Sequence, residues 1–392
     1  MMIEPVGFSG IRYYTEALSR QLVANGMSLA LVTSRHYERL PVPPPYRVYE
    51  VMGGGDRTQS RLQRGVDYML RQLKVADVVR MERPDLIHMQ SALVNTVDIL
   101  LLRWLRYRGL PVVYTVHEPS RASLLYTARW RIAMNRVVDR QIYHSANQLI
   151  VHTWIDRTQL IERYGVPAER ITRIEHGNHF LQLEGIDIPS RDDSRIRLGL
   201  PLNVPVGLFF GDRRYSKGLD LLIDALPRII AEVPEFRLII AGRAQAAYRD
   251  VDFEAMLQER GVRDHVILDD RYIPNEQVAI YFAACDLVIL PYRNISQSGV
   301  VHLAFSFGRP VVAARVGGLA EVVEEGVTGL FIEQVEDREE VATKIIHAAQ
   351  HRDWLAILGQ RARQQAESRF GWDSIARTTL DLYAKVLRKH CA

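Results

Sequence analysis

The sequence predicts an α/β protein built from two doubly wound, Rossmann-like domains. The chain has 392 residues, more than the roughly 100–200 residues that one hydrophobic core usually serves. Short apolar runs of strand length alternate with longer segments of helical periodicity, as in βαβ units whose parallel sheet is buried on both faces. This alternation occurs twice, and a polar stretch separates the two series.

The first series predicts an N-terminal domain over residues 1–184. Helical periodicity predicts helices at Tyr13–Ala24 and Leu62–Met81. Apolar runs predict the strands Met2–Glu4, Leu29–Thr33, Leu86–His88, Val112–Val116 and Gln148–His152. We expect these elements to form the acceptor-binding half of the molecule.

The second series predicts a C-terminal domain over residues 185–371. The polar run Pro189-Ser190-Arg191-Asp192-Asp193-Ser194 is typical of a linker. The strands predicted after it are Val206–Phe210, Arg237–Ala241, Val266–Leu268, Leu287–Leu290 and Val311–Ala313, and the helices are Leu219–Val233, Asp252–Arg260 and Glu276–Ala284. Residues 372–392 form a helical tail that we expect to pack back on the N-terminal domain.

Composition excludes several classes of protein. The chain has two cysteines, Cys285 and Cys391, outside any CxxC spacing, so we expect a reducing cytoplasm and no disulfide framework. The N-terminus lacks the pattern of a signal peptide, and arginines soon interrupt the apolar stretch at Ile99–Leu102. No GxxxxGK[ST] loop is present, and the basic residues lack interleaved aromatics, so we expect no nucleic-acid partner.

Charge is distributed unevenly along the chain. Residues 1–180 carry 24 Lys/Arg against 16 Asp/Glu, and the remainder carries 26 against 30. A helical pattern over Arg121–Arg140 places Arg129, Arg136 and Arg140 on one face near Trp130. These features predict peripheral contact with the anionic inner face of a membrane. An ordinary solvated basic helix explains the same residues.

A basic loop follows the predicted strand Val206–Phe210. It reads Gly211-Asp212-Arg213-Arg214-Tyr215-Ser216-Lys217-Gly218 and leads into a helix. Cations beside a helix N-terminus can bind a diphosphate, because their charges add to those of the backbone N–H groups. The alternative is a solvated loop without a ligand.

A second strand-to-helix junction contains Ser296-Gln297-Ser298-Gly299-Val300. Gly299 would let a phosphate approach the backbone amides, whereas ordinary helix capping explains the serines equally well. Near the N-terminus, Gly7-Phe8-Ser9-Gly10 also follows a strand, and its amides could close over the same phosphates. We therefore expect these segments to bind a pyrophosphate-containing ligand.

Histidines stand at the ends of several predicted strands. His117 follows Val112–Val116, and a neutral imidazole there could orient an acceptor hydroxyl. The alternative is a structural histidine. His88, His152 and His176 occupy comparable positions, but no His/Asp/Glu spacing matches a metal site, so we expect no metal.

The residues resemble the GT-B-fold glycosyltransferases of family 4. The similarity runs from Ile3 to the C-terminal helix. It is carried by Gly7-Phe8-Ser9-Gly10 with Tyr14, Pro84–His88, Tyr114–Glu118, Phe209–Gly211 with Arg214 and Lys217-Gly218, Ala284–Leu287, Pro291-Tyr292, Gly308–Val312, Gly317-Gly318-Leu319-Ala320-Glu321 and Gly326–Gly329.

The resemblance implies a retaining sugar transfer from a UDP- or GDP-linked donor to a glycan, lipid-linked or small-molecule acceptor. It implies no cofactor beyond the nucleotide sugar and requires no metal. It assigns Arg214 and Lys217 to the donor diphosphate and His117 to the reacting sugars. It assigns Ser9, Gly10, Gly211, Ser296, Gln297, Ser298, Gly299, Val300 and Glu321 to donor binding.

The sequence departs from the family at one motif. Family members commonly carry two glutamates separated by seven residues, and here those positions fall on Ser296 and on Ala304 or Leu303. The first glutamate usually contacts the transferred sugar and the second the ribose. Two alternatives to an active transferase follow. One is a catalytically silent module that binds a nucleotide sugar or glycan, and the other is a sugar-nucleotide epimerase on the same fold.

Overall fold

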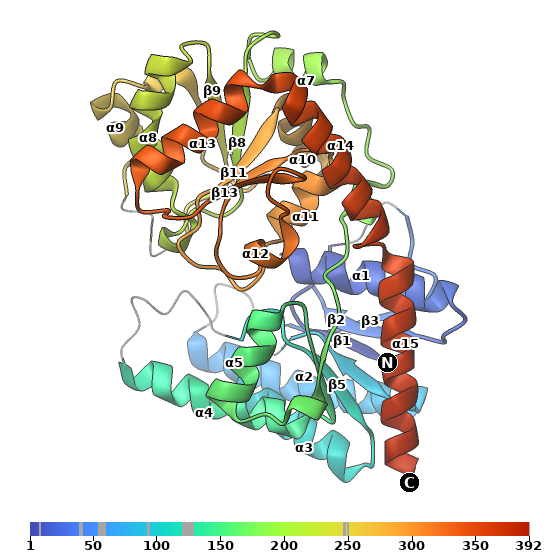
Figure 1. Ribbon diagram of the computed structural model, residues 1–392. Coiled ribbons are helices and arrows are strands. Elements are labelled where there is room, and N and C mark those ends of the chain that lie inside the picture. The colour runs from blue at the N-terminus through green and yellow to red at the C-terminus, as the bar shows by residue number, and fades with distance from the viewer. Residues whose placement is uncertain are drawn as a thin grey trace. The chain divides into compact units, whose positions relative to one another are not determined.

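The computed structural model describes residues 1–7, 9–38, 42–53, 60–91, 95–119, 129–245, 248 and 251–391. Contacts divide the chain into two compact units (Figure 1). The first unit comprises Met1–Gly177 and Phe370–Ala392, and the second comprises Asn178–Arg369. The C-terminal helix therefore belongs to the first unit.

The first unit is built on a seven-stranded parallel sheet of order β3-β2-β1-β4-β5-β6-β7. Its strands are β1 Met2–Glu4, β2 Ala30–Ser34, β3 Arg47–Met52, β4 Ile87–Met89, β5 Val112–Thr115, β6 Gln148–Val151 and β7 Ile171–Arg173. The five predicted strands are confirmed with small shifts in their ends. The sequence analysis missed the two edge strands, because β3 is partly exposed and lacks an apolar run, and β7 has only three residues.

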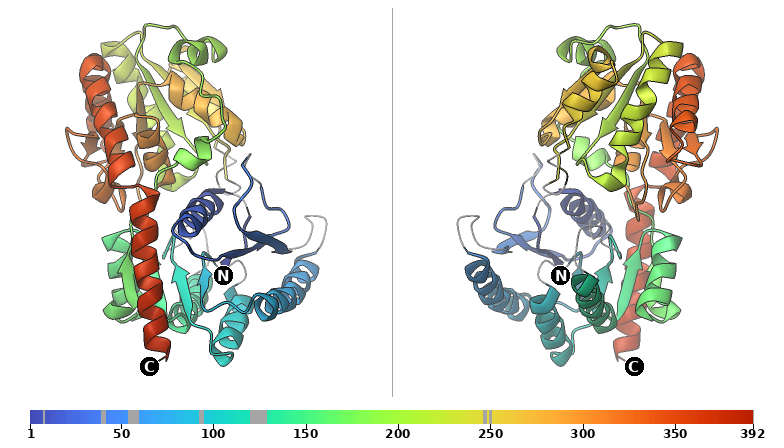
Figure 2. Two further views of the ribbon diagram at one scale, coloured as in Figure 1. Left: turned by 90° about the vertical axis from the view of Figure 1, so that its right-hand side faces the viewer. Right: turned by 90° about the vertical axis from the view of Figure 1, so that its left-hand side faces the viewer.

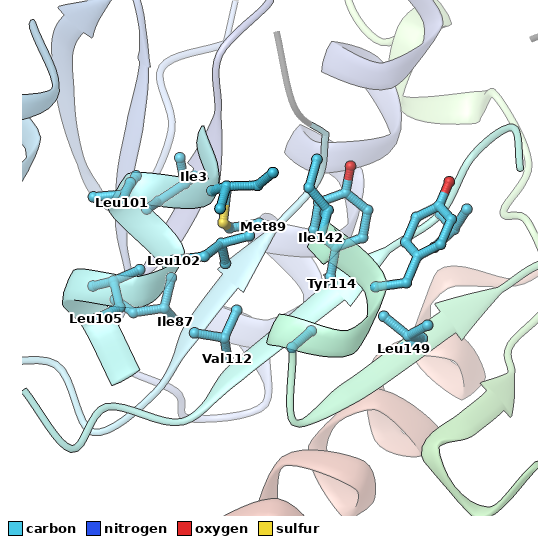
Figure 3. Close-up of a cluster of buried hydrophobic side chains, with 14 of the residues drawn as sticks. Ile3, Ile87, Met89, Leu101, Leu102, Leu105, Val112, Tyr114, Ile142 and Leu149 are labelled. Carbon is cyan, nitrogen blue, oxygen red and sulfur yellow. The ribbon is translucent and has the colours of Figure 1, made fainter. Parts of the chain in front are cut away.

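Helices cover both faces of this sheet. They are α1 Ser9–Ala24, α2 Arg61–Glu82, α3 Asn95–Tyr107, α4 Arg129–Ser145, α5 Trp154–Tyr164 and α15 Trp372–Cys391. Side chains on one face, such as Met2 and Val113, form a core with α1 and α15, which Figure 2 shows beside each other. Their neighbours Ile3 and Val112 point to the other face, into a core that residues of α2, α3 and α4 complete. Figure 3 shows part of this core, with residues of α3 and α4 against the strands. This alternation is the period-two pattern of strands buried on both sides.

The second unit contains a six-stranded parallel sheet of order β10-β9-β8-β11-β12-β13. The strands are β8 Val206–Phe210, β9 Arg237–Ala241, β10 Val266–Asp269, β11 Leu287–Leu290, β12 Val311–Ala314 and β13 Gly329–Ile332. The helices are α6 Phe180–Leu183, α7 Arg191–Arg197, α8 Leu219–Glu232, α9 Phe253–Glu259, α10 Asn275–Ala284, α11 Gly299–Ser306, α12 Leu319–Val322, α13 Arg338–Gln350 and α14 Arg352–Ser368. The predicted fold class, α/β with two doubly wound sheets, is confirmed, and β13 is the strand that the sequence analysis missed.

The predicted linker is wrong over part of its length, because Arg191–Arg197 forms helix α7. The Ser190 hydroxyl accepts a hydrogen bond from the backbone N–H of Asp193 and caps this helix. Arg195 is fully buried and donates to the Ala284 carbonyl at 2.9 Å and to Asp286 at 2.9 Å. These distant partners stabilise a helix too short to show a clear hydrophobic period.

Both sheets contain a point where the strand order reverses. It lies between β1 and β4 in the first unit and between β8 and β11 in the second. Open α/β sheets bind ligands beyond the carboxyl ends of the strands at such a point. Each unit therefore has one preferred place for a site. Among the described residues, no helix has the length and apolar character needed to cross a bilayer.

Candidate functional site

Three loops meet at the carboxyl edge of the second sheet. They follow the adjacent strands β8, β11 and β12. The backbone N–H of Arg293 donates to the Ser216 carbonyl at 2.9 Å, which joins the first two loops. The N–H of Gly318 donates to the Ser296 carbonyl at 2.9 Å, which joins the second and third. The structure thus brings together the two junctions that the sequence analysis predicted to bind a pyrophosphate.

Glycines allow these loops to approach closely. Gly211 has φ +103°, and a Cβ there would lie 3.6 Å from Nζ of Lys217 and 3.7 Å from Cγ2 of Val300. Gly218 has φ +64°, and a Cβ there would lie 2.0 Å from the Pro291 carbonyl oxygen. Only a residue without a side chain fits at that second position.

Lys217 is held at this edge by Tyr292. It lies in the 3₁₀ turn Tyr215–Lys217 and is 8% exposed, and its Nζ donates to the Tyr292 hydroxyl at 3.0 Å. The ammonium also lies 4.6 Å from the centre of the Tyr292 ring. Among the described residues no carboxylate forms an ion pair with Lys217 or Arg214. Both cations are therefore available to neutralise an anionic ligand.

Unpartnered polar atoms lie in the loop before helix α11 and in the loop that contains Lys217. The Nε of Arg214, Oε1 of Gln297 and Oγ of Ser298 are buried and have no hydrogen-bond partner among the described residues. Ser298 is the N-cap residue of α11, yet its side chain makes no capping hydrogen bond. Because buried polar groups normally have a partner, these atoms are suited to binding a ligand, and capping does not account for Ser298.

The two family glutamate positions are uncharged in the structure as in the sequence. Ser296 is buried in the loop before α11, and Leu303 and Ala304 are buried within that helix. Glu321, the acidic residue predicted at this site, lies in α12 after β12 and is partly buried. Its backbone carbonyl accepts a hydrogen bond from Arg369 at 3.1 Å.

At the carboxyl end of β1 a buried glutamate shapes the predicted glycine loop. The Glu4 carboxylate accepts hydrogen bonds from the backbone N–H groups of Val6 and Gly7, each at 2.8 Å, and from the Thr33 hydroxyl at 3.2 Å. Burial raises the pKa of Glu4, and these hydrogen bonds oppose the rise. Gly7 has φ +79°, which favours glycine.

The remaining residues of this loop are described unevenly. Ser9 and Gly10 open helix α1, and Gly10 is exposed, with no atom of the described residues within 4 Å of an ideal Cβ. Phe8 and the Ser9 side chain lie outside the described residues. Glu4 itself was not identified from the sequence, because a single glutamate at a strand end carries no recognisable spacing.

Four imidazoles gather near the carboxyl ends of neighbouring strands of the first sheet: His88 lies within β4, and His117, His152 and His176 follow β5, β6 and β7. The Tyr14 ring lies among three of them, with its centre 5.0 Å from that of His117, 4.9 Å from His152 and 5.3 Å from His176. The fourth, His88, bonds through Nε2 to the Thr115 hydroxyl at 2.7 Å and through Nδ1 to the Tyr383 hydroxyl of α15. Sequence analysis identified the strand-end histidines but assigned no role to the Tyr14 ring.

Three of these imidazoles, those of His88, His117 and His152, have lowered pKa values and are neutral at ordinary pH. Burial lowers the pKa of His88 to about 3 and that of His152 to about 4. Burial, reinforced by His152 and His88, lowers the pKa of His117 well below its usual value. A neutral His117 can exchange hydrogen bonds with hydroxyl groups without introducing a charge.

The segment predicted to contact a membrane is only partly described. Residues 120–128 and the side chains of Arg129 and Trp130 lie outside the described residues. Within α4, the guanidinium of Arg136 donates to the Arg163 carbonyl at 2.7 Å, at the end of helix α5. This contact gives Arg136 a structural role, and membrane contact stays a prediction.

Comparison with known proteins gives consistent matches over both halves of the chain. A family model described as Glycosyltransferase Family 4 matches residues 8–178, and one described as Glycosyl transferases group 1 matches residues 204–351. A D-inositol 3-phosphate glycosyltransferase of Xylanimonas cellulosilytica is 32% identical over 302 residues, which cover 74% of this chain and 69% of that protein. One of Thermobispora bispora is 28% identical over 397 residues, covering 97% and 90% respectively.

Solved structures resemble the chain at lower sequence identity. Sucrose-phosphate synthase from Thermosynechococcus elongatus has a TM-score of 0.78 at 20% identity and covers 99% of both chains. Anabaena HepE in complex with UDP and glucose has a TM-score of 0.73 at 21% identity and covers 98% of both. At these identities the comparison shows a shared fold.

Proposed function

The chain belongs to the family 4, group 1 glycosyltransferases, and we propose that it moves a sugar from a nucleoside-diphosphate donor to a hydroxyl of an acceptor. One observation carries the donor half of this proposal. The loops after β8 and β11 bring Lys217 close to Val300 at the N-terminus of α11, and Arg214 lies in the same loop as Lys217; no described carboxylate neutralises either cation. A diphosphate carries the complementary charge and acceptor oxygens.

In the proposed reaction these groups stabilise the leaving diphosphate. Negative charge develops on the phosphate oxygens as the bond between the anomeric carbon and the diphosphate breaks and a bond to the acceptor oxygen forms, and Lys217, Arg214 and the first N–H groups of α11 face that charge. We propose that transfer retains the anomeric configuration and requires no metal, with the acceptor hydroxyl approaching the face that the diphosphate leaves. His117 then orients a reacting hydroxyl.

The relatives suggest which substrates to try first. HepE was solved with UDP-glucose as well as with UDP and glucose, which supports a UDP-sugar as the first donor. Several curated relatives are named as D-inositol 3-phosphate glycosyltransferases, so inositol 3-phosphate is the first acceptor to test. We propose a cytoplasmic location, because the chain has two cysteines and Cys285 is a buried free thiol.

The test is a donor screen combined with a charge-removing variant. Purified protein is mixed with UDP- and GDP-sugars, with and without acceptors, while thermal stabilisation and release of nucleoside diphosphate are followed. We expect one donor to stabilise the protein and to release its nucleotide only when acceptor is present. Lys217→Ala should then lower kcat about 10²–10³-fold, because an electrostatic contact to the leaving group is lost.

Lys344→Ala is the matched control. Lys344 lies in α13 of the same unit and pairs with Glu325 at 3.8 Å, so its loss should leave turnover unchanged. Near-normal turnover in Lys217→Ala would refute the assignment of this site.

A silent nucleotide-sugar-binding module is the second candidate. The uncharged residues at Ser296, Leu303 and Ala304 favour it, because the usual carboxylates to sugar and ribose are missing. It predicts stabilisation by a donor without release of nucleotide under any acceptor. Acceptor-dependent release rules it out, and conversion of the donor sugar without acceptor would indicate the epimerase.

A further inference from the structure

Gln90 lies between His88 and His117, two of the four clustered imidazoles described above. It follows β4 and is fully buried, and its backbone N–H donates to the Ile3 carbonyl at 2.9 Å. Its amide Nε2 donates to Sδ of Met2 at 3.0 Å and lies 3.3 Å from Nε2 of His88. Its Oε1 lies 3.3 Å from Nε2 of His117.

The Met2 sulfur decides which way the amide points. A thioether can accept a hydrogen bond but cannot donate one, so the amide nitrogen and not the oxygen must face Met2. The ring nitrogens of His88 are already engaged by Tyr383 and Thr115. The amide oxygen therefore faces His117, and it can only accept.

An acceptor opposite Nε2 of His117 determines where the ring proton resides. The ring is neutral, because burial and the neighbouring His152 and His88 lower the pKa of His117. A neutral imidazole carries one proton, on either nitrogen. If Nε2 donates to Gln90, then Nδ1 holds the lone pair, and no described residue bonds to Nδ1.

We propose that Gln90 is a positioning residue that holds His117 as the Nε2–H tautomer, so that Nδ1 accepts a hydrogen bond from the acceptor hydroxyl. The hydrogen bond from the acceptor hydroxyl rests on the proposed sugar transfer, whereas the assignment of the His117 tautomer does not. Gln90 affects the substrate only through the His117 ring and does not itself touch the substrate. In this arrangement His117 accepts the hydrogen bond and the acceptor hydroxyl donates it, a direction that the sequence analysis left open.

A long-range ¹H–¹⁵N NMR spectrum of the full-length protein tests the tautomer without any substrate. The wild type should show a protonated Nε2 and an unprotonated Nδ1 at His117. Gln90→Leu removes the acceptor and should give a mixture of both tautomers. A wild-type ring protonated at Nδ1, or a His117 spectrum that is the same in Gln90→Leu, would overturn the proposal.

Gln148→Leu is the matched control for folding. Gln148 is a buried glutamine of β6 whose amide donates to the Glu169 carbonyl and to the Thr172 hydroxyl at 3.0 Å. It should leave the His117 spectrum unchanged. Gln90→Leu is interpreted only at temperatures where its thermal unfolding shows a folded protein, and Gln90→Glu serves as the second variant if it does not fold.

Kinetics test the hydroxyl contact once a substrate pair is known. Gln90→Leu should lower kcat/KM for acceptor about 5- to 10-fold, as expected for a lost neutral hydrogen bond, with donor KM unchanged. An effect on donor KM alone would contradict the assignment to the acceptor.

Gln90→Glu distinguishes positioning from a merely structural role. Its carboxylate still accepts from Nε2–H and should restore acceptor KM at high pH. Its charge also favours the imidazolium, so activity should decline at a higher pH than in the wild type as pH falls. Among the described residues, the other titratable groups found to face His117 are Tyr14, His88 and His152, which the wild type and both Gln90 variants share. A pH profile identical to that of the wild type would refute the proposal.

Discussion

Lys217 and Tyr292 form a buried cation–hydroxyl pair in the second unit. The tyrosine is fully buried, and its hydroxyl accepts the hydrogen bond of Nζ at 3.0 Å. The pair fixes the position of a long side chain that would otherwise lose considerable rotamer freedom on meeting a ligand. Tyr292 thus contributes to donor binding through Lys217.

Tyr292→Phe should therefore raise donor KM about 3- to 10-fold with a smaller effect on kcat. The substitution keeps the ring and removes one hydrogen bond from the charged ammonium; this bond positions Lys217 without touching the donor, so only part of its net contribution of about 1.5–3 kcal/mol is lost from donor binding. Steady-state kinetics with varied donor measure the change. Tyr281→Phe is the control, since Tyr281 of α10 bonds to Asp269 of β10. If both variants match the wild type, the pair has no part in donor binding.

At the scale of elements, α15 completes the core of the first unit. It is the last helix of the chain, yet Leu382 and Val386 pack into the cluster formed by α1 and the sheet, and Tyr383 bonds to His88 of β4. An amphipathic face buried in this way provides most of the stability of a helix. The first unit consequently depends on residues that follow the whole second unit in sequence.

Leu382→Ala should lower the free energy of unfolding by about 2–5 kcal/mol, because it removes buried methyl groups and leaves a cavity. Urea unfolding followed by circular dichroism measures the change. Lys385→Ala, an exposed site on the same helix, should change it by less than about 0.5 kcal/mol. Equal effects of the two substitutions would show that α15 does not contribute to this core.

For the whole molecule, the buried imidazoles make the first unit sensitive to acid. His88 and His152 have pKa values of about 3 and about 4 in the folded protein, below the roughly 6.5 of an unfolded histidine. Between these values the unfolded chain binds more protons. The stability that these neutral histidines give the folded state is therefore complete above about pH 6.5, and it is lost as the pH falls toward 4.

The free energy of unfolding falls as the pH is lowered, and His152→Asn should reduce that fall by about 1.4 kcal/mol per pH unit between pH 6.5 and 4. Asparagine can replace the hydrogen bond from Nδ1 of His152 to the Ile174 carbonyl without titrating. Unfolding free energies measured across this range test the prediction. His347→Asn, at an exposed histidine of the second unit, is the control. A variant as acid-sensitive as the wild type would show that His152 is not responsible.

Much of the fold was predictable because central parallel strands are buried on both faces. Runs such as Leu287–Leu290 are therefore continuously apolar, and many helices that connect such strands show a clear helical period of apolar residues. The helices α13 and α14 of the second unit were not predicted. Nor were the strands β3, β7 and β13 and the helix α7. They are short or lie at sheet edges, and contacts with distant residues stabilise them.

The sequence alone determined the fold class, the family resemblance and the cationic loop at Arg214 and Lys217, because each depends on local pattern or on ordered motifs. Tertiary structure decided which residues meet. The strand order puts the loops after β8, β11 and β12 side by side. It also places Gln90 against His117 and Tyr383 against His88. A lone glutamine or tyrosine has no sequence signature of such a role, which arises only when folding brings distant polar groups into one buried site.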